Sequence, residues 1–216
     1  MISITTLSDF LKTYEPRKIT GRQLFIRSSV AIVLADNHFA DKISMLMIRR
    51  AIRKDDPWSG DMGFPGGRFS VTKDKNIYET AVRELYEETG VEIKDGLENI
   101  GRLSELLTKA HEKIAPMIIT PFVFKINKTP DLKKNNEVEE LIWIPLSYFF
   151  NQQNRVAMEV GKGKFKWNFP SYIYNKKCIW GLSLSMIDEL RDINDHILNG
   201  TNIRRKLFVP PKLKGF

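Results

Sequence analysis

One segment, residues 77–89, constrains the fold of this chain more than any other. Ile77, Ala81 and Leu85 are spaced four apart, so an α-helix would place them on one buried face. Gly90 follows at a position where a left-handed residue often ends a helix. We therefore predict a helix over residues 77–89 that packs against the protein core through this face.

Segments rich in β-branched and apolar residues flank this helix and predict strands. The first two are separated by a short turn and predict a hairpin. The predicted strands are 24–35, 43–50, 116–126, which Pro121 is expected to break, and 138–144, and residues 99–107 are predicted to form a strand or a turn. Strands that alternate with helices favour an α/β fold, with a mixed sheet between helices on both faces.

The remaining chain has weaker signals. A helix is predicted over 4–14, capped by Thr6 or Ser8, and another begins at 146–150. Apolar residues at helical spacing predict a long helix over 179–199. Glycines and prolines predict a loop over 51–67, and 165–174 is predicted to be irregular or extended.

Composition excludes some classes of protein. Of the 216 residues, 42% are hydrophobic and 28% are charged, which is typical of a globular chain. The net charge of +8 attracts anions, either nucleic acid or a phosphate-rich small molecule. Lysines and arginines are scattered and are not interleaved with aromatic residues, so a nucleic-acid partner is not expected.

The chain also carries signals about its compartment. It has one cysteine, Cys178, which cannot form an internal disulfide and is predicted to be a buried apolar residue. The N-terminus does not resemble a signal peptide, and no run of about 18 apolar residues predicts a membrane span. We predict a cytoplasmic protein that does not act at a membrane and is either a monomer or a homodimer.

Carboxylates lie on a second face of the predicted helix. Glu84, Glu87 and Glu88 stand at i, i+3 and i+4, where like charges cost roughly 0.2–0.5 kcal/mol per pair. A divalent cation removes this repulsion. Hard oxygen ligands favour Mg²⁺, or Mn²⁺ as a substitute, over Zn²⁺.

A glycine-rich loop precedes the same helix. Gly66 and Gly67 let the backbone approach a ligand closely, so that their carbonyl or amide groups reach a metal or a phosphate. Arg83, next to Glu84, can orient a carboxylate through its forked guanidinium. The combination of loop, arginine and carboxylates points to phosphate chemistry.

Residues 67–91 resemble the Nudix box, whose core is complete here as Arg83-Glu-Leu-Tyr-Glu-Glu-Thr-Gly-Val91. The resemblance implies a Nudix-type α/β/α sandwich and a Mg²⁺-dependent pyrophosphohydrolase, in which water attacks a phosphorus of a diphosphate. It also implies Glu87 and Glu88 as the main metal ligands, with Glu84 as a further ligand or the proton acceptor. Arg83 would orient these glutamates, and the Gly66 carbonyl would complete the metal site.

The chain departs from the box at one place. Lys75 stands where the box expects a glutamate, Asp74 lies next to it, and the segment from Gly67 to Arg83 is longer than usual. The expected glutamate is peripheral to the metal in this family. The departure leaves the role of Asp74 open.

Residues 56–68 look like the coenzyme A pyrophosphatase-like subgroup, in which arginines precede a Phe-Pro-Gly-Gly segment. Arg49, Arg50 and Arg53 supply arginines, while Asp56 stands where the signature places its second one. The resemblance favours coenzyme A and its derivatives as substrates. ADP-ribose, NADH and dinucleoside polyphosphates are alternatives.

Further residues have two interpretations each. Glu137 is a candidate extra ligand or general base, or else a surface charge before a strand. Arg49, Arg50 and Arg53 either bind substrate phosphates or only solubilise a strand end. Trp58 either stacks on a base or anchors its loop, and Gly67 would lie against the substrate. His38, His111 and His196 are isolated and are predicted to be structural or exposed.

We expect a helical extension over 1–20, a Nudix hydrolase domain over 21–200 and a basic, flexible tail over 201–216. Two other functions remain open. A non-catalytic nucleotide-binding module is one, although such proteins usually lose carboxylates from the box. A hydrolase of RNA ends is the other, suggested by the basic charge.

Overall fold

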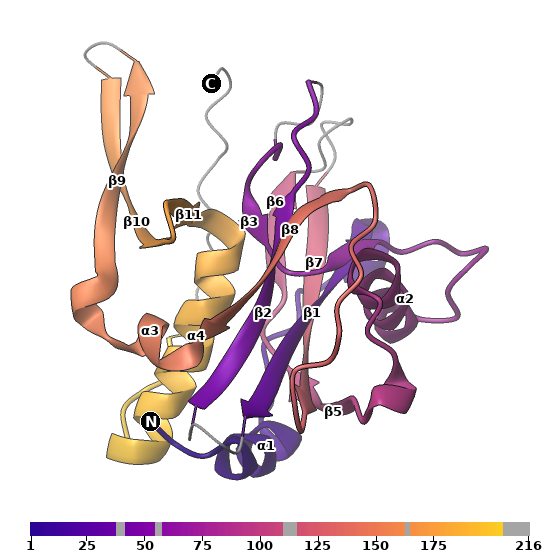
Figure 1. The fold of residues 1–216 in the computed structure, drawn as a ribbon, viewed down its shortest axis with the longest axis horizontal. Helices are drawn as coiled ribbons and strands as arrows, with labels where there is room; N and C mark the ends of the chain where they lie inside the picture. Colours follow the sequence, from indigo (N-terminus) through magenta and orange to yellow (C-terminus); the bar gives the residue numbers. More distant parts are fainter. Residues whose placement is uncertain (38–41, 55–57, 110–115, 163–164, 205–216) are drawn as a thin grey trace.

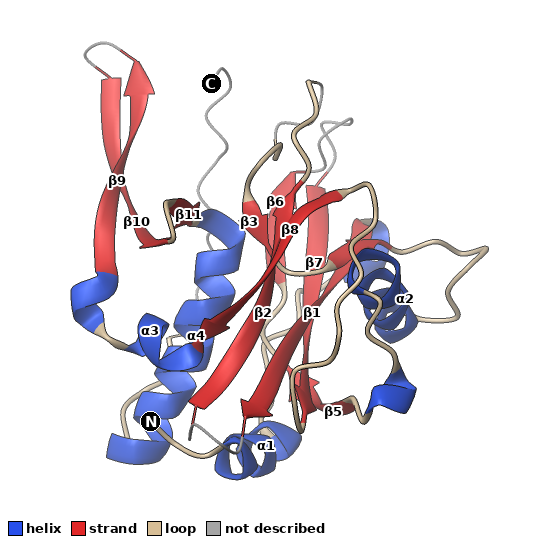
Figure 2. Cartoon of the chain, in the orientation of Figure 1, coloured by secondary structure: helices blue, strands red, loops and turns tan. Residues whose placement is uncertain are grey.

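The computed structural model of the chain describes residues 1–37, 42–54, 58–109, 116–162 and 165–204. An eight-stranded mixed sheet lies between helices, and a three-stranded antiparallel sheet adjoins it (Figures 1 and 2). The predicted α/β/α sandwich with a mixed sheet is therefore confirmed. No helix in these ranges is long and apolar enough to cross a membrane.

The helices and strands follow the predicted order closely. The α-helices are α1 Ile4–Thr13, α2 Ile77–Thr89, α3 Leu146–Phe150 and α4 Gly181–Asn199. The strands of the large sheet are β1 Ile26–Asn37, β2 Lys42–Arg50, β3 Met62–Gly63, β4 Gly66–Arg68, β5 Glu98–Arg102, β6 Leu106–Lys109, β7 Pro116–Ile126 and β8 Val138–Pro145. The predicted loop over 51–67 thus contains two short strands, and residues 99–107, predicted to be a strand or a turn, belong to the two strands β5 and β6.

The central strand β1 brings distant parts of the chain together. It pairs antiparallel with β2, as the predicted hairpin required, and with β4 of the glycine-rich loop. On its other side it pairs in parallel with β7, from Ile26 opposite Met117 to Ala35 opposite Ile126. β8 then pairs with β2. The same end of the sheet therefore carries the start of β1, the strand β4 and the end of β2.

The predicted break at Pro121 is wrong, because β7 runs through it without interruption. The Pro121 carbonyl accepts a hydrogen bond from Leu103 N–H at 3.0 Å, in the gap between β5 and β6. The amide and carbonyl of one strand residue point to the same side, so the missing N–H of Pro121 faces this gap. The ladder to β1 loses no hydrogen bond, which is how a strand tolerates proline.

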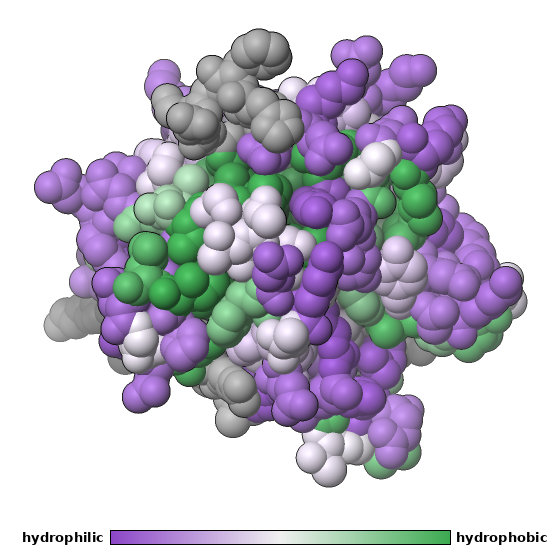
Figure 3. All heavy atoms as spheres, turned by 90° about the horizontal axis from the view of Figure 1, so that it is seen from below, coloured by the Kyte–Doolittle hydropathy of each residue, from purple (hydrophilic) through white to green (hydrophobic). Residues whose placement is uncertain are grey.

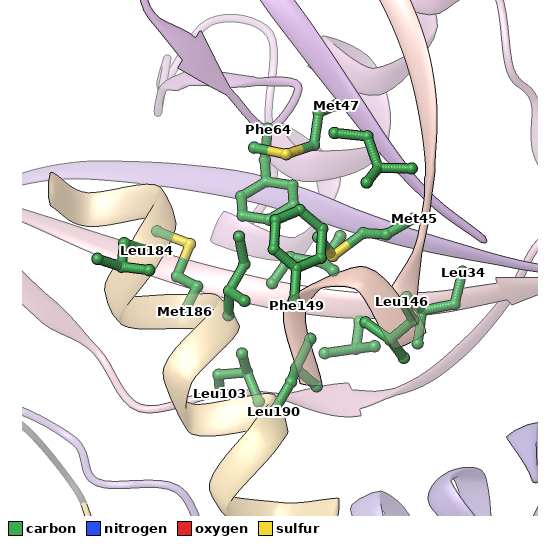
Figure 4. Close-up of a cluster of buried hydrophobic side chains, with 14 of the residues drawn as sticks. Leu34, Met45, Met47, Phe64, Leu103, Leu146, Phe149, Leu184, Met186 and Leu190 are labelled. Carbon is green, nitrogen blue, oxygen red and sulfur yellow. The ribbon is translucent and has the colours of Figure 1, made fainter. Parts of the chain in front are cut away.

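Two hydrophobic clusters cover the two faces of the sheet. Ala81 and Leu85 of α2 pack with Ala31 and Val33 of β1 and with neighbouring strands on one face. The larger cluster, on the other face, joins α1, α3 and α4 to the sheet. Figure 4 shows Phe149 of α3 and Leu190 of α4 among the side chains of this cluster.

Helix α1 belongs to this larger cluster through Ile4, Leu7 and Leu11. Its cap is Ser3, whose hydroxyl accepts from Thr6 N–H at 3.1 Å, so the predicted caps Thr6 and Ser8 are wrong. Ser8 is instead a buried residue within the helix. The N-terminal segment thus contributes directly to the core that the sheet builds.

The second sheet consists of β9 Arg155–Lys162, β10 Phe165–Tyr174 and β11 Lys177–Ile179. Residues 165–174 are therefore a regular strand, the extended alternative of the prediction. The β9–β10 hairpin projects beyond the body of the molecule in Figure 1. Its base is held by a forked ion pair in which Arg155 Nη2 lies 3.0 Å from Asp188 Oδ2 of α4.

The surface mixes polar and apolar residues. On the face seen from below in Figure 3, hydrophobic residues lie near the centre and hydrophilic residues dominate the rim. Such mixing is ordinary for a folded protein surface, so it does not locate a site.

Candidate functional site

Helix α2 carries most of the predicted site, and it begins and ends as its sequence predicts. The Asn76 side chain caps it by accepting from Tyr78 N–H at 3.0 Å and from Glu79 N–H at 3.1 Å. Gly90 ends it in the left-handed region, with φ of 75°. The helix therefore has the predicted bounds, residues 77–89.

Glu88 is the most buried of the predicted metal ligands, with 2% of its surface exposed. The Gly66 N–H donates to Glu88 Oε2 at 2.9 Å, which ties the glycine-rich loop to the helix. Burial raises the pKa of Glu88 to about 8, against the effect of this hydrogen bond, and the charges of Glu84 and Glu137 raise it further.

Glu84 lies against the same loop. A Cβ atom at Gly67 would overlap the Glu84 carboxylate, and one at Gly66 would overlap the backbone of β1. Only glycine fits at either position, because the loop is packed between strand and helix. Burial also raises the pKa of Glu84, partly offset by Arg83.

Arg83 joins the carboxylates. Its Nη1 donates to Glu84 Oε1 at 2.7 Å and to Glu87 Oε2 at 3.2 Å. Glu87 is the most exposed of the three, with 40% side-chain exposure, and its other oxygen lies 3.8 Å from Lys73 Nζ. The arginine therefore links Glu84 and Glu87 as the resemblance implied, while Glu88 is held by the loop.

Asp74 is a member of the site that sequence reasoning did not assign. Its buried carboxylate accepts from Arg83 Nε at 2.7 Å and from Arg83 Nη2 at 2.9 Å. It also accepts from Thr80 Oγ1 and Ser70 N–H, each at 3.0 Å. These bonds, led by the one from Arg83, hold the pKa of Asp74 well below its usual range. Asp74 thus fixes the guanidinium from the side opposite the glutamates.

Asp74, one residue before Lys75, therefore provides a carboxylate that binds Arg83. The sequence contains a signal for this contact, because Asp74 flanks the position where the box expects a glutamate. The aspartate side chain is one methylene shorter than that of glutamate, and the longer segment from Gly67 to Arg83 makes the position hard to align. Only the folded loop places the carboxylate on Arg83.

Glu137 lies at the start of β8, close to the helix carboxylates. Its charge contributes to the raised pKa of both Glu84 and Glu88, which places it within electrostatic range of them. Arg53 accompanies it, with Nη1 at 3.7 Å from Glu137 Oε1 and Nη2 donating to the Asn136 carbonyl at 3.0 Å. Arg53 therefore forms an ion pair with Glu137.

The adjacent residues Arg49 and Arg50 have different surroundings. The charge of Arg50 acts on Glu88 and lowers its pKa, so Arg50 lies within electrostatic range of this carboxylate. Arg49 Nε instead donates to the Gly60 carbonyl at 3.4 Å. The predicted group of three arginines is divided, with Arg50 and Arg53 beside the acids and Arg49 supporting the loop.

Trp58 lies in this loop and is half-buried. Its carbonyl accepts from Asp61 N–H at 3.0 Å, which closes the turn before β3. Strand β3 and then Gly66 and Gly67 of β4 follow this turn. Asp56 lies outside the described residues.

A cavity of about 700 Å³ opens beside the exposed side of α2. Its lining includes Tyr86, Glu87 and the lysines Lys128, Lys133 and Lys134. Glu87 belongs to both the cavity and the carboxylate cluster. A ligand in the cavity would therefore reach the cluster.

The carboxylates suit a hard divalent cation in type, because all are oxygen ligands, and burial first and neighbouring carboxylates second raise the pKa of Glu84 and Glu88. Across the described residues, however, no three His, Cys, Asp or Glu side chains are already arranged around one metal position. Glu87 would have to turn from Arg83 to join Glu84 and Glu88. The donor set fits the metal, and its final arrangement depends on binding.

Residues outside the site behave as ordinary structural groups. His196 packs on Phe10 with ring centres 5.5 Å apart, and its Nδ1 lies 2.6 Å from the Thr201 carbonyl. Cys178 is half-buried beside Met158, and burial raises the pKa of its thiol, which disfavours a nucleophile. His38 and His111 lie outside the described residues.

The family comparison agrees with this geometry. The NUDIX domain model matches residues 26–163, which include β1, the glycine-rich loop, α2 and Glu137. A MutT/nudix family protein from Enterococcus faecalis has a similar fold, with a TM-score of 0.53 at 15% identity over 94% of this chain and 73% of that one.

Two curated relatives are similar in sequence. An uncharacterized protein of Schizosaccharomyces pombe is 28% identical over 80% of this chain and 57% of its own length. The peroxisomal coenzyme A diphosphatase ndx-8 of Caenorhabditis elegans is 32% identical over 62% of this chain and 53% of its own length. The chain thus spans about half the length of these relatives.

Proposed function

Because this chain belongs to the Nudix family, we propose that it hydrolyses the diphosphate linkage of a nucleoside-diphosphate-linked small molecule, with coenzyme A and its derivatives as the favoured substrates. The observation that carries the proposal is the hydrogen bond from Gly66 N–H to Glu88 Oε2, at 2.9 Å, which connects the glycine-rich loop to α2. It gathers buried acids beside a backbone that a phosphate can approach.

Mg²⁺ is the proposed cofactor, with Mn²⁺ as a substitute, and Glu84, Glu87, Glu88 and the Gly66 carbonyl are its proposed ligands. When bound, such an ion neutralises phosphate charge and lowers the pKa of the attacking water. The raised pKa of Glu84 and Glu88 supports this assignment, because burial and then neighbouring carboxylates disfavour their charged forms, and a bound cation offsets both effects.

The chain's own groups would orient the reaction. Arg83, fixed by Asp74, sets the direction of Glu84 and Glu87. Arg50 and Arg53 lie beside the acids, where they can bind substrate phosphates. Gly67 lets the Glu84 carboxylate lie against the glycine-rich loop, at a place where a Cβ atom would overlap that carboxylate.

In the proposed reaction a water oxygen bonds to one phosphorus, and the bridging P–O bond of the diphosphate breaks. The water proton passes to a carboxylate, and two phosphate-bearing products leave. Glu84 and Glu137 are the candidate acceptors. Glu137 is favoured because Arg53 lies 3.7 Å from it, whereas Arg83 donates to Glu84 at 2.7 Å.

The preference for coenzyme A rests on two supports, both of which come from the sequence. One is the sequence around Arg50 and the Phe64-Pro-Gly-Gly67 segment, which looks like that subgroup. The other is the similarity to a coenzyme A diphosphatase. ADP-ribose, NADH and dinucleoside polyphosphates are the alternatives.

The test is to incubate the purified chain and Mg²⁺ with coenzyme A, ADP-ribose, NADH, a dinucleoside polyphosphate and nucleoside triphosphates, and to identify products by mass. We expect 3′,5′-ADP and 4′-phosphopantetheine from coenzyme A. If only another compound is cleaved, coenzyme A is rejected as the substrate, and the hydrolysis of a diphosphate linkage is supported. No cleavage with either Mg²⁺ or Mn²⁺ would reject the reaction and favour a binding module.

A further inference from the structure

A second charged cluster lies across β1 from the catalytic one. It contains Arg22 of the 3₁₀ helix η1 (Arg22–Leu24), Arg27 of β1 and Arg102 of β5, around the single acid Glu105. Four separate segments of the chain contribute these residues. We call them the arginine cluster.

The strand register places the arginine cluster on the face of the sheet that α2 covers. Arg102 is the partner of Phe122 in the register, and Phe122 belongs to the core under α2. Arg27 Nη2 donates to Thr120 Oγ1 at 3.3 Å, two residues before Phe122 on β7. The Arg27 carbonyl accepts from Phe69 N–H at 3.0 Å, just after β4. The cluster therefore borders the glycine-rich loop on the side away from Arg50.

Charge in this cluster is not balanced. Glu105 is 1% exposed, and its Oε2 accepts from Ile19 N–H at 2.7 Å. Its Oε1 lies 3.7 Å from both Arg22 Nε and Arg27 Nη2. Glu105 is the only acid whose charge acts on Arg27 and Arg102 among their main interactions. One carboxylate thus faces three guanidinium groups.

The hydrogen bonds are also incomplete. Among the described residues, Arg27 Nε and Glu105 Oε1 are buried atoms without a hydrogen-bond partner. Burial lowers the pKa of Arg27 and Arg102, and neighbouring arginines lower it further. Unpaired buried charge is costly, so a counter-charge at this place would stabilise the fold.

We propose that Arg22, Arg27 and Arg102 form a binding site for a phosphate-type oxyanion, distinct from the carboxylate cluster. If the arginines served only to neutralise Glu105, one of them would suffice. Guanidinium groups match the oxygens of a phosphate through paired hydrogen bonds. Arg22 and Arg27 keep 35% and 21% of their side chains exposed, so an anion can reach them.

Two sources can supply this anion. One is free inorganic phosphate, acting as a bound effector. The other is a phosphate monoester on the substrate, remote from the diphosphate that is cut. The second source rests on the proposed function, whereas the first does not require any activity.

The first experiment measures thermal unfolding of the full chain in chloride buffer without divalent metal, as inorganic phosphate is added. Arg22→Gln and Arg102→Gln are compared with Arg204→Gln, a matched change at an exposed arginine elsewhere. We expect phosphate to raise the Tm of the wild type and of Arg204→Gln. The apparent Kd for phosphate should rise about tenfold or more in each cluster variant.

The sign of the effect without phosphate separates binding from a structural role. Removing one of three facing cations should leave the Tm unchanged or raise it, because repulsion falls. If the arginines were only partners of Glu105, both variants would lower the Tm and phosphate would not matter. Arg22→Gln decides the matter if Arg102→Gln does not fold, since Arg22 lies in the short 3₁₀ helix η1 and Arg102 lies in a strand of the large sheet.

A second arm identifies the source by comparing KM for coenzyme A and 3′-dephospho-coenzyme A. If the substrate's phosphate occupies the site, Arg22→Gln raises only the KM for coenzyme A, by about tenfold. If free phosphate occupies it, both KM values stay unchanged while the Tm response is lost. No Tm response in the wild type together with unchanged KM values would overturn the proposal. If neither compound is cut, the proposed function fails and the Tm response still decides.

Discussion

The carboxylate cluster and the arginine cluster are opposite in charge and similar in construction. Glu84, Glu87 and Glu88 gather against Arg83 on one side of the glycine-rich loop. Three arginines gather against Glu105 on the other side. Each places like charges together at partial or complete burial, with too little opposite charge beside them.

The difference lies in how each cluster is supported. The acids stand on one helix, and Arg83, which is held by Asp74, links Glu84 and Glu87, so a bound ion has to turn only Glu87. The arginines come from separate segments, and the acid beside them, Glu105, lies 3.7 Å from Arg22 and from Arg27. We infer that the first cluster is organised for catalysis, and that the second is organised for binding.

The largest expected effect tests whether the acids are a metal site. Glu87→Gln combined with Glu88→Gln should lower kcat by about 10³-fold or more, because metal charge stabilisation contributes several kcal/mol. Turnover of the best substrate with Mg²⁺ is the measurement. Glu98→Gln, a change at an acid on β5 that pairs with Lys12 and Lys125, is the control. Full activity in the double variant would show that Glu87 and Glu88 are not metal ligands and only form a solvated face of the helix. The contrast between a catalytic and a binding cluster would then no longer hold.

A smaller effect tests the support of Arg83. Asp74→Asn should lower kcat by about 10–100-fold with a smaller change in KM, because the residues behind metal ligands usually matter to this extent. Asp74→Glu keeps the carboxylate and should restore part of the loss. Equal activity in Asp74→Asn and the wild type would mean that Arg83 needs no second anchor. Such a result would remove the difference in support between the clusters.

The neighbours Arg50 and Arg49 provide a matched pair. Arg50→Gln should raise KM by about tenfold, the effect of losing one charge-assisted hydrogen bond, because Arg50 lies within electrostatic range of Glu88. Arg49→Gln should change KM by less than about twofold on the same scale, since Arg49 bonds the Gly60 carbonyl. Equal effects in initial-rate assays would show that both arginines reach the substrate.

The smallest expected effect concerns stability and pH without metal. Glu88 has a pKa raised to about 8 from 4.5, so its contribution to stability is complete below about pH 4.5 and is lost as pH rises through 8. The Tm in a chelator should fall by a few degrees over this range. Glu88→Gln should remove this fall, and Mg²⁺ should oppose it in the wild type alone. The same slope in the variant would assign the pH dependence to another group.

The pH dependence of stability expected from Asp74 has the opposite sign to that expected from Glu88. Its pKa is lowered by Arg83, so its contribution is present above its ordinary pKa, near pH 4, and is lost on acidification. The expected loss from Asp74 lies at lower pH than the loss from Glu88. The two slopes are therefore separable in one pH series.

Local features of the sequence predicted the helix that carries the acids. Glu84, Glu87 and Glu88 follow helical spacing, and Gly90 ends the helix, so no tertiary information was needed to place the acids on one face. The fold class followed from the alternation of strands and helices. By contrast, the break expected at Pro121 ignored which side of the strand its nitrogen faces, and that depends on Leu103.

Contacts between distant segments were not predictable in the same way. Asp74 reaches Arg83 only because the intervening loop folds back. Arg22, Arg27 and Arg102 meet only once β1 and β5 are both set against β7. No periodicity in the chain joins residues so far apart, so the arginine cluster had no sequence signal.

The parallel pairing of β1 with β7 affects the order in which the chain folds. Ser29 Oγ donates to the Thr120 carbonyl across 91 residues, and all of α2 lies within the loop that this contact closes. Contacts between such distant residues slow folding, because chain entropy must be given up before they form. During synthesis, the helix can form early, but its acids have no sheet to rest on until β7 has emerged. We therefore expect a chain truncated before β7 to retain helical content at residues 77–89 and to lack every property of the site.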